Sequence, residues 1–142
     1  MVVFGGRYSE SIDAPFVCDG VVDESSVYVD HCYPEGILEW DGETSSWTHI
    51  VATDPEGDGN PSGRFGHRLF YDPVSELNLL VGGHIKTFPT RTDIFSEEVW
   101  GWNGESWKLM TGGDPDKDGY PEPRLHFAAS LDPVNHKVLF FG

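Results

Sequence analysis

The pentapeptide Leu79–Gly83 (LLVGG) is an apolar run that closes on two glycines, and related runs occur twice more in the chain. These counterparts are Val2–Gly6 (VVFGG) and Val138–Gly142 (VLFFG). A second stretch recurs in the same register, because residues 54–64 (DPEGDGNPSGR) match residues 114–124 (DPDKDGYPEPR), sixty positions later. Landmarks that recur in one register predict an internal structural repeat.

A tryptophan-containing hairpin is the next repeated feature. The segment Ile37–Gly42 (ILEWDG) matches Val99–Gly104 (VWGWNG), and Trp47 matches Trp107. Both segments end on Asp-Gly or Asn-Gly, which are the dipeptides that favour a tight β-hairpin turn. The chain also contains 17 Gly and 10 Pro, and their frequency favours short strands joined by tight loops. We therefore predict an all-β fold.

Each repeated unit is predicted to contain four short antiparallel strands. The first predicted strand is Arg64–Tyr71 in one unit and Arg124–Leu131 in the next. The second strand is the apolar run that ends in glycine, and the two tryptophan-containing segments form the third and fourth strands. A four-stranded sheet of this size cannot bury its own faces, so it must stack on copies of itself, as the blades of a β-propeller do. The pattern assigns residues 1–63 to a partial blade, 64–123 to a complete blade and 124–142 to the start of a third. Because both end blades are incomplete, we expect a fragment of a longer propeller that packs against further blades of the same or a neighbouring chain, and the alternative is a self-assembling homo-oligomer.

The order of these motifs resembles the kelch repeat of bacterial proteins and is similar to the central domain of galactose oxidase. The resemblance rests on the apolar strand that ends in Gly-Gly, on the spacing of Trp40 and Trp47, and on the stretch Arg64–His67 (RFGH). It covers nearly the whole chain apart from residues 7–36. One departure is Arg124–His126 (RLH), in which the histidine stands one place early. The resemblance implies a kelch-type propeller in which both histidines are structural and lie near the blade core.

The net charge excludes two classes of partner. The chain carries 24 acidic and 9 basic residues, which gives a net charge of −15. Nucleic acids and anionic membrane surfaces would be repelled by such a chain. No apolar run approaches the roughly 20 residues that a membrane-spanning helix needs, so we expect no membrane insertion. The acidity itself favours either solubility alone or the binding of a cation.

Two cysteines, Cys18 and Cys32, lie in the predicted insertion at residues 7–36. The spacing does not match the usual zinc motifs, and only His31 stands close enough to join them as a further ligand. We therefore predict a loop-closing disulfide, which favours an oxidising compartment. The expected location is extracellular, at the cell surface or periplasmic, with an export signal that lies outside this chain.

Acidic residues gather in two matched loops, and the later one has the pattern D-x-D-x-D-G. Carboxylates at positions 1, 3 and 5, followed by a glycine that permits a sharp turn, are typical of the oxygen-only shell that Ca²⁺ prefers. The predicted ligands of this loop are Asp114, Asp116, Asp118, the backbone carbonyl of Tyr120, and Glu122. The earlier loop is a poorer version, with candidate ligands Asp54, Glu56, Asp58 and Asn60. Asp-Pro and Asp-Gly are also ordinary turn residues, so both loops can equally be acidic turns without a metal.

The sequence indicates no catalytic site, because it lacks the motifs of serine hydrolases, P-loop enzymes and dinucleotide-binding enzymes. Four of the five tryptophans are assigned to blade packing, and only Trp100 lacks a counterpart in the first unit, where Leu38 stands. We expect a non-catalytic propeller module of a secreted or surface protein that binds a protein or a glycan. The alternatives are a calcium-ordered filament subunit and a fragment of a kelch-type enzyme. The identity of the ligand is beyond the sequence.

Overall fold

The computed structural model describes the chain apart from residues 12–19, 24–28, 88–91, 113–121, 133 and 136. Every regular element in the described part is a β-strand, and all strand pairs within the sheets are antiparallel. The predicted all-β class is therefore confirmed. No helix in this part of the chain has the length and apolar character needed to cross a membrane.

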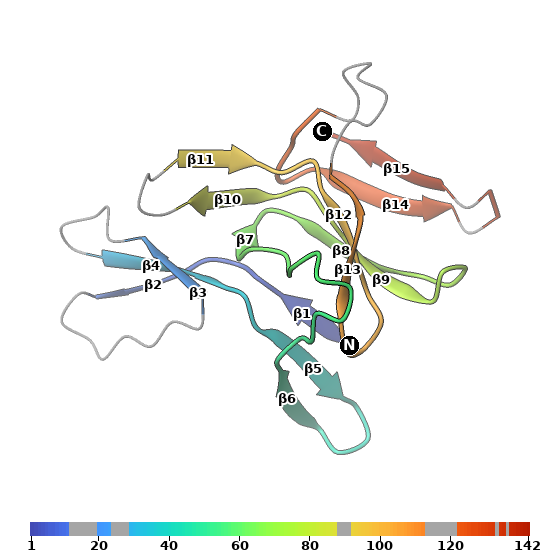
Figure 1. Cartoon of the computed structure of the whole chain (residues 1–142), viewed down its shortest axis with the longest axis horizontal. Helices are drawn as coiled ribbons and strands as arrows, with labels where there is room; N and C mark the ends of the chain where they lie inside the picture. The colour runs from blue at the N-terminus through green and yellow to red at the C-terminus, as the bar shows by residue number, and fades with distance from the viewer. Residues whose placement is uncertain (12–19, 24–28, 88–91, 113–121, 133, 136) are drawn as a thin grey trace.

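A four-stranded sheet, here called the central sheet, occupies the middle of the molecule (Figure 1). Its strands, in spatial order, are β13 (Trp107–Thr111), β12 (Val99–Trp102), β9 (Leu77–Val81) and β8 (Arg68–Asp72). The turn between β8 and β9 is stabilised by Asp72, whose carboxylate accepts the backbone N–H groups of Val74 and Ser75. Such an Asx turn is the local structure that an Asp-Pro pair favours.

Two smaller sheets repeat parts of this arrangement. The N-terminal sheet has the order β1-β5-β6, and the C-terminal hairpin consists of two strands. The strands are β1 (Val2–Phe4), β5 (Ile37–Asp41), β6 (Ser46–Ile50), β14 (Ala128–Asp132) and β15 (Lys137–Phe141). By their position in the repeat, β1 and β15 are the counterparts of β9, while β14 is the counterpart of β8.

Additional sheets are inserted at the glycine-rich turns of both units, whereas the sequence predicted an insertion only in the first. The sheet β2-β4-β3 lies between β1 and β5, and the hairpin β10-β11 lies between β9 and β12, with the short strand β7 beside it. The bounds are β2 (Tyr8–Ser11), β3 (Gly20–Asp23), β4 (Val29–Pro34), β7 (Arg64–Phe65), β10 (His84–Thr87) and β11 (Thr92–Phe95). The two inserted sheets are neighbours, since β3 contacts β10 and β4 contacts β7 (Figure 1).

The predicted strands Arg64–Tyr71 and Arg124–Leu131 are both interrupted. Strands β8 and β14 each begin four residues after the predicted start. The chain bends at Gly66 and at His126, whose φ angles of 70° and 55° lie in the left-handed region. Because His126 stands sixty positions after Gly66, it occupies the glycine's place in the repeat.

The main core lies between the N-terminal sheet and the central sheet. Its buried members are Phe4, Ile37, Leu80, Trp100, Trp102 and Trp107. Two equivalent tryptophan pairs differ in burial, because Trp102–Trp107 is covered by Phe4, while Trp47 of the pair Trp40–Trp47 is 49% exposed. The expectation that Trp100 stands apart from the packing tryptophans is wrong, since Trp100 is buried in the core. Burial depends on which face another sheet covers, and the repeat pattern alone does not show that.

The paired glycines of each unit dock on the backbone of the next unit. The Gly6 N–H donates to the Arg64 carbonyl oxygen at 2.7 Å, and the Gly83 N–H donates to the Arg124 carbonyl oxygen at 3.1 Å. A Cβ atom on Gly5 would lie only 2.5 Å from that Arg64 oxygen, and Gly5 has a φ of 64°. Glycine is required there by both the close approach and the backbone angle. The sequence repeat is thus also a repeat of contacts.

Candidate functional site

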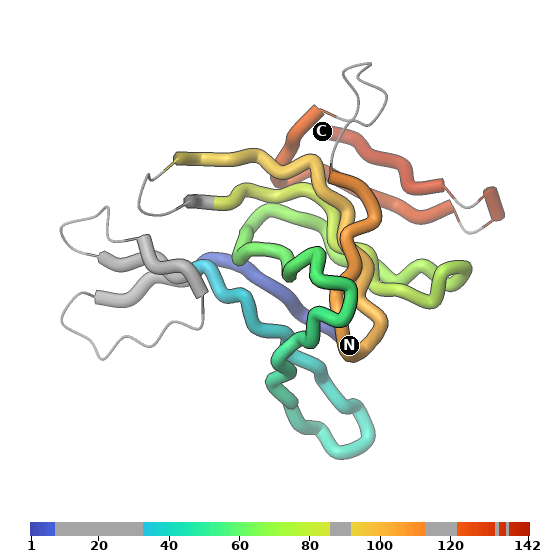
Figure 2. The backbone as a smooth tube through the Cα atoms, in the orientation of Figure 1, coloured from blue at the N-terminus to red at the C-terminus, as the bar shows by residue number. Residues whose placement is uncertain are grey.

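The glycine-rich turns, the described strands of the inserted sheets and the connection that precedes Arg64 lie at one end of the central sheet. In the antiparallel register, Val81 pairs with both Arg68 and Val99, and Val99 pairs with Thr111. We call this end of the strands the diglycine end. The connection that precedes Arg64, residues 51–63, reaches it by running beside β13 (Figure 2), with a parallel bridge between Thr53 and Ser106.

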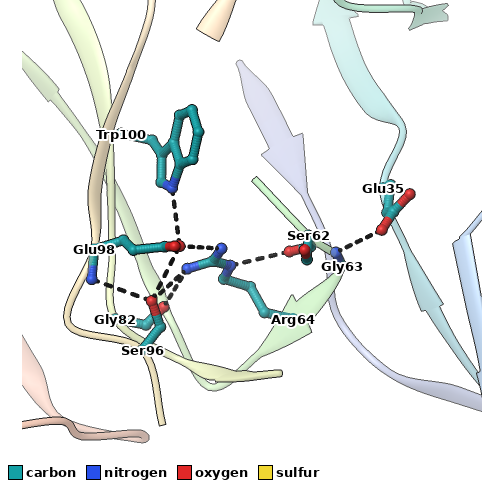
Figure 3. A network of polar contacts seen from close by, with 8 residues as sticks. All are labelled: Glu35, Ser62, Gly63, Arg64, Gly82, Ser96, Glu98 and Trp100. Carbon is teal, nitrogen blue, oxygen red and sulfur yellow. Dashed lines mark hydrogen bonds and ion pairs between the residues drawn. The ribbon is translucent and has the colours of Figure 1, made fainter. Parts of the chain in front are cut away.

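A buried ionic network lies under the diglycine end (Figure 3). The Arg64 side chain is fully buried and donates to Glu98 Oε2 at 2.7 Å, to Ser96 Oγ at 2.9 Å and to two backbone carbonyl oxygens. Glu98 also accepts hydrogen bonds from Ser96 Oγ and from Trp100 Nε1 at 3.0 Å. Three elements are thereby joined, namely the connection before β7, the turn after β9 and the start of β12.

The pKa values in this network follow from burial and pairing. Burial raises the pKa of Glu98, but the hydrogen bonds from Trp100, Arg64 and Ser96 and the charge of Arg64 outweigh that effect and leave it below the ordinary value. Burial lowers the pKa of Arg64, while Glu98 opposes that shift. A guanidinium stays charged even so. The network is therefore a fixed ion pair whose hydrogen bonds go to neighbouring structural groups.

The second unit contains half of the same arrangement. Arg124 Nε donates to the carbonyl oxygen of Glu122 and its NH1 to that of Gly142, just as Arg64 donates to the carbonyl oxygens of Ser62 and Gly82. Arg124 is only partly buried, and no carboxylate in the described part of the chain is paired with it. The carboxylate paired with Arg64 belongs to Glu98, which directly precedes β12, and the described residues contain no counterpart of this segment after β15.

The two histidines that the resemblance placed near the blade core have different environments. His67 is largely buried beside Phe4, with ring centroids 6.1 Å apart, and burial together with the charge of Arg64 lowers its pKa to about 4. His126 is exposed and lies outside any strand, so its assignment to the core is wrong. The residue that corresponds to His67 sixty positions later is Phe127, which is 1% exposed.

An aromatic and basic cluster surrounds Phe65 at the diglycine end. The distances from the Phe65 ring centroid are 4.9 Å to His84, 5.8 Å to His126, 5.9 Å to Tyr33 and 5.0 Å to the Arg7 guanidinium carbon. His84 also contacts Phe95 at 5.2 Å, and its Nε2 lies 3.0 Å from an oxygen of Asp93. We call these six residues, Arg7, Tyr33, Phe65, His84, Phe95 and His126, the Phe65 cluster.

Sequence reasoning missed the Phe65 cluster, because its members come from separate loops and inserted strands. Phe65 and His84 become neighbours only through the pairing of β7 with β10. Arg7 precedes an inserted sheet and Tyr33 lies within its strand β4, and the strand pairing of this sheet has no repeat pattern. The one available signal was His126 at a position where the matched unit has Gly66.

The earlier acidic loop uses its carboxylates to hold backbone groups. Asp54 accepts the N–H groups of Gly57 at 2.9 Å and of Gly59 at 3.1 Å, and Asp58 accepts the Leu109 N–H of β13 at 2.8 Å. Glu56 is exposed, and Asn60 lines a cavity of about 370 Å³ together with Trp107 and residues of the N-terminal sheet. Among the described residues, no three acidic, histidine or cysteine side chains come together as a metal site. In the structure the carboxylates of Asp54 and Asp58 accept backbone amides, and calcium binding by this loop stays a prediction.

Several predicted site residues lie outside the described part of the chain. In the later acidic loop these are Asp114, Asp116, Asp118 and Tyr120, whereas Glu122 is described and exposed. Cys18 is also outside, and for Cys32 only the backbone in β4 is described. The calcium ligands of this loop and the disulfide therefore stay predictions.

Comparisons of this chain with known proteins found no match. No family model, no curated protein and no solved structure matches the chain. What the protein does must therefore be inferred from its own geometry, beginning with the repeated contact between units and the residues gathered at the diglycine end.

Proposed function

We propose that this chain is a run of kelch-type β-propeller blades that serves as a non-catalytic binding module. In this proposal the central sheet is a complete blade, and the N-terminal sheet and C-terminal hairpin are parts of its two neighbours. The support is the same contact made twice, by Gly6 with Arg64 and by Gly83 with Arg124. A contact that repeats with the sequence period is what stacked units in a propeller need.

The residue before the glycines differs in exposure between the units, and this difference also supports the proposal. The last apolar residue before the glycines is Phe4 in the first unit, Val81 in the second and Phe141 in the third. Phe4 is 3% exposed and Val81 is 8% exposed, because each lies against the next unit, but Phe141 is 84% exposed. Leu139, two residues earlier on the same face of β15, is 62% exposed, and adjacent exposed apolar side chains indicate a contact surface. A further unit of the same repeat has the matching shape, so we assign that surface to it.

The proposal is tested by adding such a unit. Residues 83–142 appended after Gly142 continue the repeat in register, because Gly142 corresponds to Gly82. Strand β15 pairs only with β14 in the described residues, whereas its counterpart β9 is paired on both sides. We expect amide hydrogen exchange in β15 to slow by about tenfold or more, since its free edge becomes paired.

The control is a flexible Gly/Ser segment of equal length at the same position, which should leave β15 exchange unchanged. If the appended repeat also leaves β15 exchange unchanged, the C-terminal hairpin does not accept a further unit, and the propeller assignment is contradicted.

The diglycine end is the binding face in this proposal. Inserted sheets and connecting loops converge there on a rigid framework, and such loops are where binding residues concentrate in proteins. The buried network of Arg64 and Glu98 supports those loops from below. In this proposal the ligand is a protein or a glycan. The protein is secreted or located at the cell surface, and Cys18 and Cys32 form a disulfide.

We include Ca²⁺ at the later acidic loop in the proposal. Its support is the D-x-D-x-D-G pattern of Asp114, Asp116 and Asp118. An ion that binds only the folded chain, present at a hundred times its dissociation constant, stabilises the fold by about 2.7 kcal/mol. We therefore expect thermal melts to shift upward when chelator is replaced by millimolar Ca²⁺, and we expect Asp116→Ala to abolish that shift.

The matched control for Asp116→Ala is Asp54→Ala in the earlier loop. Asp54 holds two backbone amides, so its loss should lower stability equally with and without Ca²⁺. Identical wild-type melting midpoints in chelator and in Ca²⁺ would show that the later loop is an acidic turn that binds no calcium.

A further inference from the structure

The Phe65 cluster concentrates basic side chains on a strongly acidic protein. The chain has a net charge of −15, yet one arginine and two histidines lie within 6 Å of the centroid of a single ring. Arg7 and His126 are both exposed, and Phe65 is partly exposed. Asp93 is an acidic neighbour of the cluster and is hydrogen-bonded to His84 Nε2. This composition favours an anionic group over a cationic one.

The backbone at His126 has the conformation that a glycine adopts in the matched unit. His126 has a φ of 55°, and the matched residue of the preceding unit is Gly66, with a φ of 70°. A non-glycine residue is disfavoured at such an angle, at which glycine is unstrained. The side chain at this position is an exposed imidazole that packs against the Phe65 ring. The His126 N–H donates to the Gly66 carbonyl oxygen at 2.8 Å, which holds the imidazole in place.

A row of aromatic side chains adjoins the basic groups. His84 lies between Phe65 and Phe95, with ring-centroid distances of 4.9 Å and 5.2 Å, and it joins the two rings into a continuous row. Phe95 is 46% exposed, and its neighbour Ile94 is 41% exposed. Asp93 fixes the orientation of the central imidazole through its hydrogen bond to Nε2. A ligand that reaches Arg7 can therefore also cover exposed aromatic surface.

We propose that the Phe65 cluster binds an organic carboxylate. The carboxylate lies between the Arg7 guanidinium and the His126 imidazole, and the ring-shaped body of the ligand rests against Phe65 and Phe95. Arginine matches a carboxylate in geometry and in charge, and imidazole supplies a further N–H donor. Arg7 is the single permanent cation of the cluster, so its charge neutralises a monoanion. A dianion would keep one uncompensated negative charge, which the net charge of −15 on the chain would repel.

This inference rests on the proposed binding function and names the class of ligand that the diglycine end accepts. A sugar acid and an aromatic acid share the required chemistry, because each carries one carboxylate on a ring. The probes are therefore D-galacturonate, benzoate, neutral D-galactose and inorganic phosphate, each titrated against the whole chain by ligand-observed NMR. We expect at least one of the two carboxylates to bind, and galactose and phosphate to bind at least about tenfold more weakly.

Two variants test the assigned residues. Arg7→Gln removes the guanidinium, and His126→Gly removes the imidazole while restoring the residue that the matched unit has at this backbone angle. Each should weaken carboxylate binding by about tenfold, the effect typical of losing one charge-assisted hydrogen bond. His126→Gly should keep the wild-type melting temperature or raise it, because glycine adopts this φ freely. A loss of binding in this variant therefore cannot be attributed to unfolding.

The matched control is Arg68→Gln. Arg68 lies over a different ring, Phe127, at 5.7 Å, so this variant changes the net charge by the same amount as Arg7→Gln. Binding in Arg68→Gln should stay within about twofold of wild type.

The proposal is overturned if neither carboxylate binds, if galactose or phosphate binds as tightly as the carboxylates, or if Arg68→Gln weakens binding as much as Arg7→Gln does. Binding by galacturonate alone would identify sugar acids as the source, and binding by benzoate alone would identify aromatic acids. The appended-unit experiment does not depend on any ligand, so failure of the propeller assignment and failure of this site are distinguishable.

Discussion

Replacing Glu98 with alanine is expected to lower the free energy of unfolding by about 2–4 kcal/mol, as measured by chemical denaturation at pH 7, which is less than for a fully buried pair because the Glu98 side chain is 34% exposed. The substitution leaves the fully buried Arg64 guanidinium without its carboxylate, at a site where its other partners are Ser96 and backbone carbonyl oxygens. It also removes the acceptor of the Trp100 indole N–H. A buried charge without a counter-charge is among the most costly defects that a single substitution creates.

Two comparisons show whether the loss comes from the ion pair. Glu97→Ala makes the same change one residue earlier, outside the network, and should alter stability by no more than about 0.5 kcal/mol. Arg124→Met removes the arginine that corresponds to Arg64 but has no paired carboxylate in the described part of the chain, so its effect should be smaller than that of Glu98→Ala. Equal losses for Glu98→Ala and Glu97→Ala would show that the pair of Arg64 and Glu98 does not support the fold.

The second large effect is a loss of stability in acid that is due to His67. Its pKa is about 4 in the folded protein against an ordinary value of 6.5, because burial and the charge of Arg64 disfavour the protonated ring. The unfolded chain therefore binds this proton at a higher pH than the folded chain does. The contribution of His67 is fully present above pH 6.5 and is lost as the pH falls from 6.5 to 4, at a cost of about 3 kcal/mol.

The variant His67→Phe isolates this contribution. Phe127 occupies the matched position of the next unit, so a phenyl ring suits the local packing. Between pH 7.5 and 4.5 the wild type should lose about 2–3 kcal/mol more stability than His67→Phe does. Glu98 titrates in a different window, because its lowered pKa keeps its contribution until the pH falls below the ordinary carboxyl range. Parallel stability curves for the two proteins would contradict the assigned environment of His67.

Local chemistry explains why part of this fold could be predicted. The Asp-Pro turn at Asp132 has a carboxylate that accepts the N–H groups of Val134 and Asn135, as at the matched Asp72 turn. The Asn103–Gly104 pair likewise lies in the turn between β12 and β13, where Asn103 accepts two backbone amides. Such turns depend on residues close in sequence, and their recurrence indicated the repeat.

Features that depend on distant residues could not be predicted in the same way. The hairpin β10-β11 and strand β7 form a sheet that has no counterpart in the repeat pattern. The exposure of Trp47 and the burial of Trp100 depend on which faces neighbouring sheets cover. The carboxylate of Asp58 accepts the Leu109 N–H across 51 positions of sequence, a contact that the loop's own pattern does not indicate.

The central claim is that each pair of glycines docks on the next unit, and the exchange rates of the Gly6 and Gly83 amide protons test it directly by NMR. Neither glycine lies in a described strand, so protection of these protons depends on the carbonyl oxygens of Arg64 and Arg124. We expect both to exchange at least about a hundredfold more slowly than unstructured peptide amides, as the amides of β9 and β12 should. Gly57, an exposed residue whose amide is held by the Asp54 side chain, should exchange much faster and serves as the internal control. Fast exchange at Gly6 or Gly83 while β9 and β12 stay protected would contradict the repeated contact.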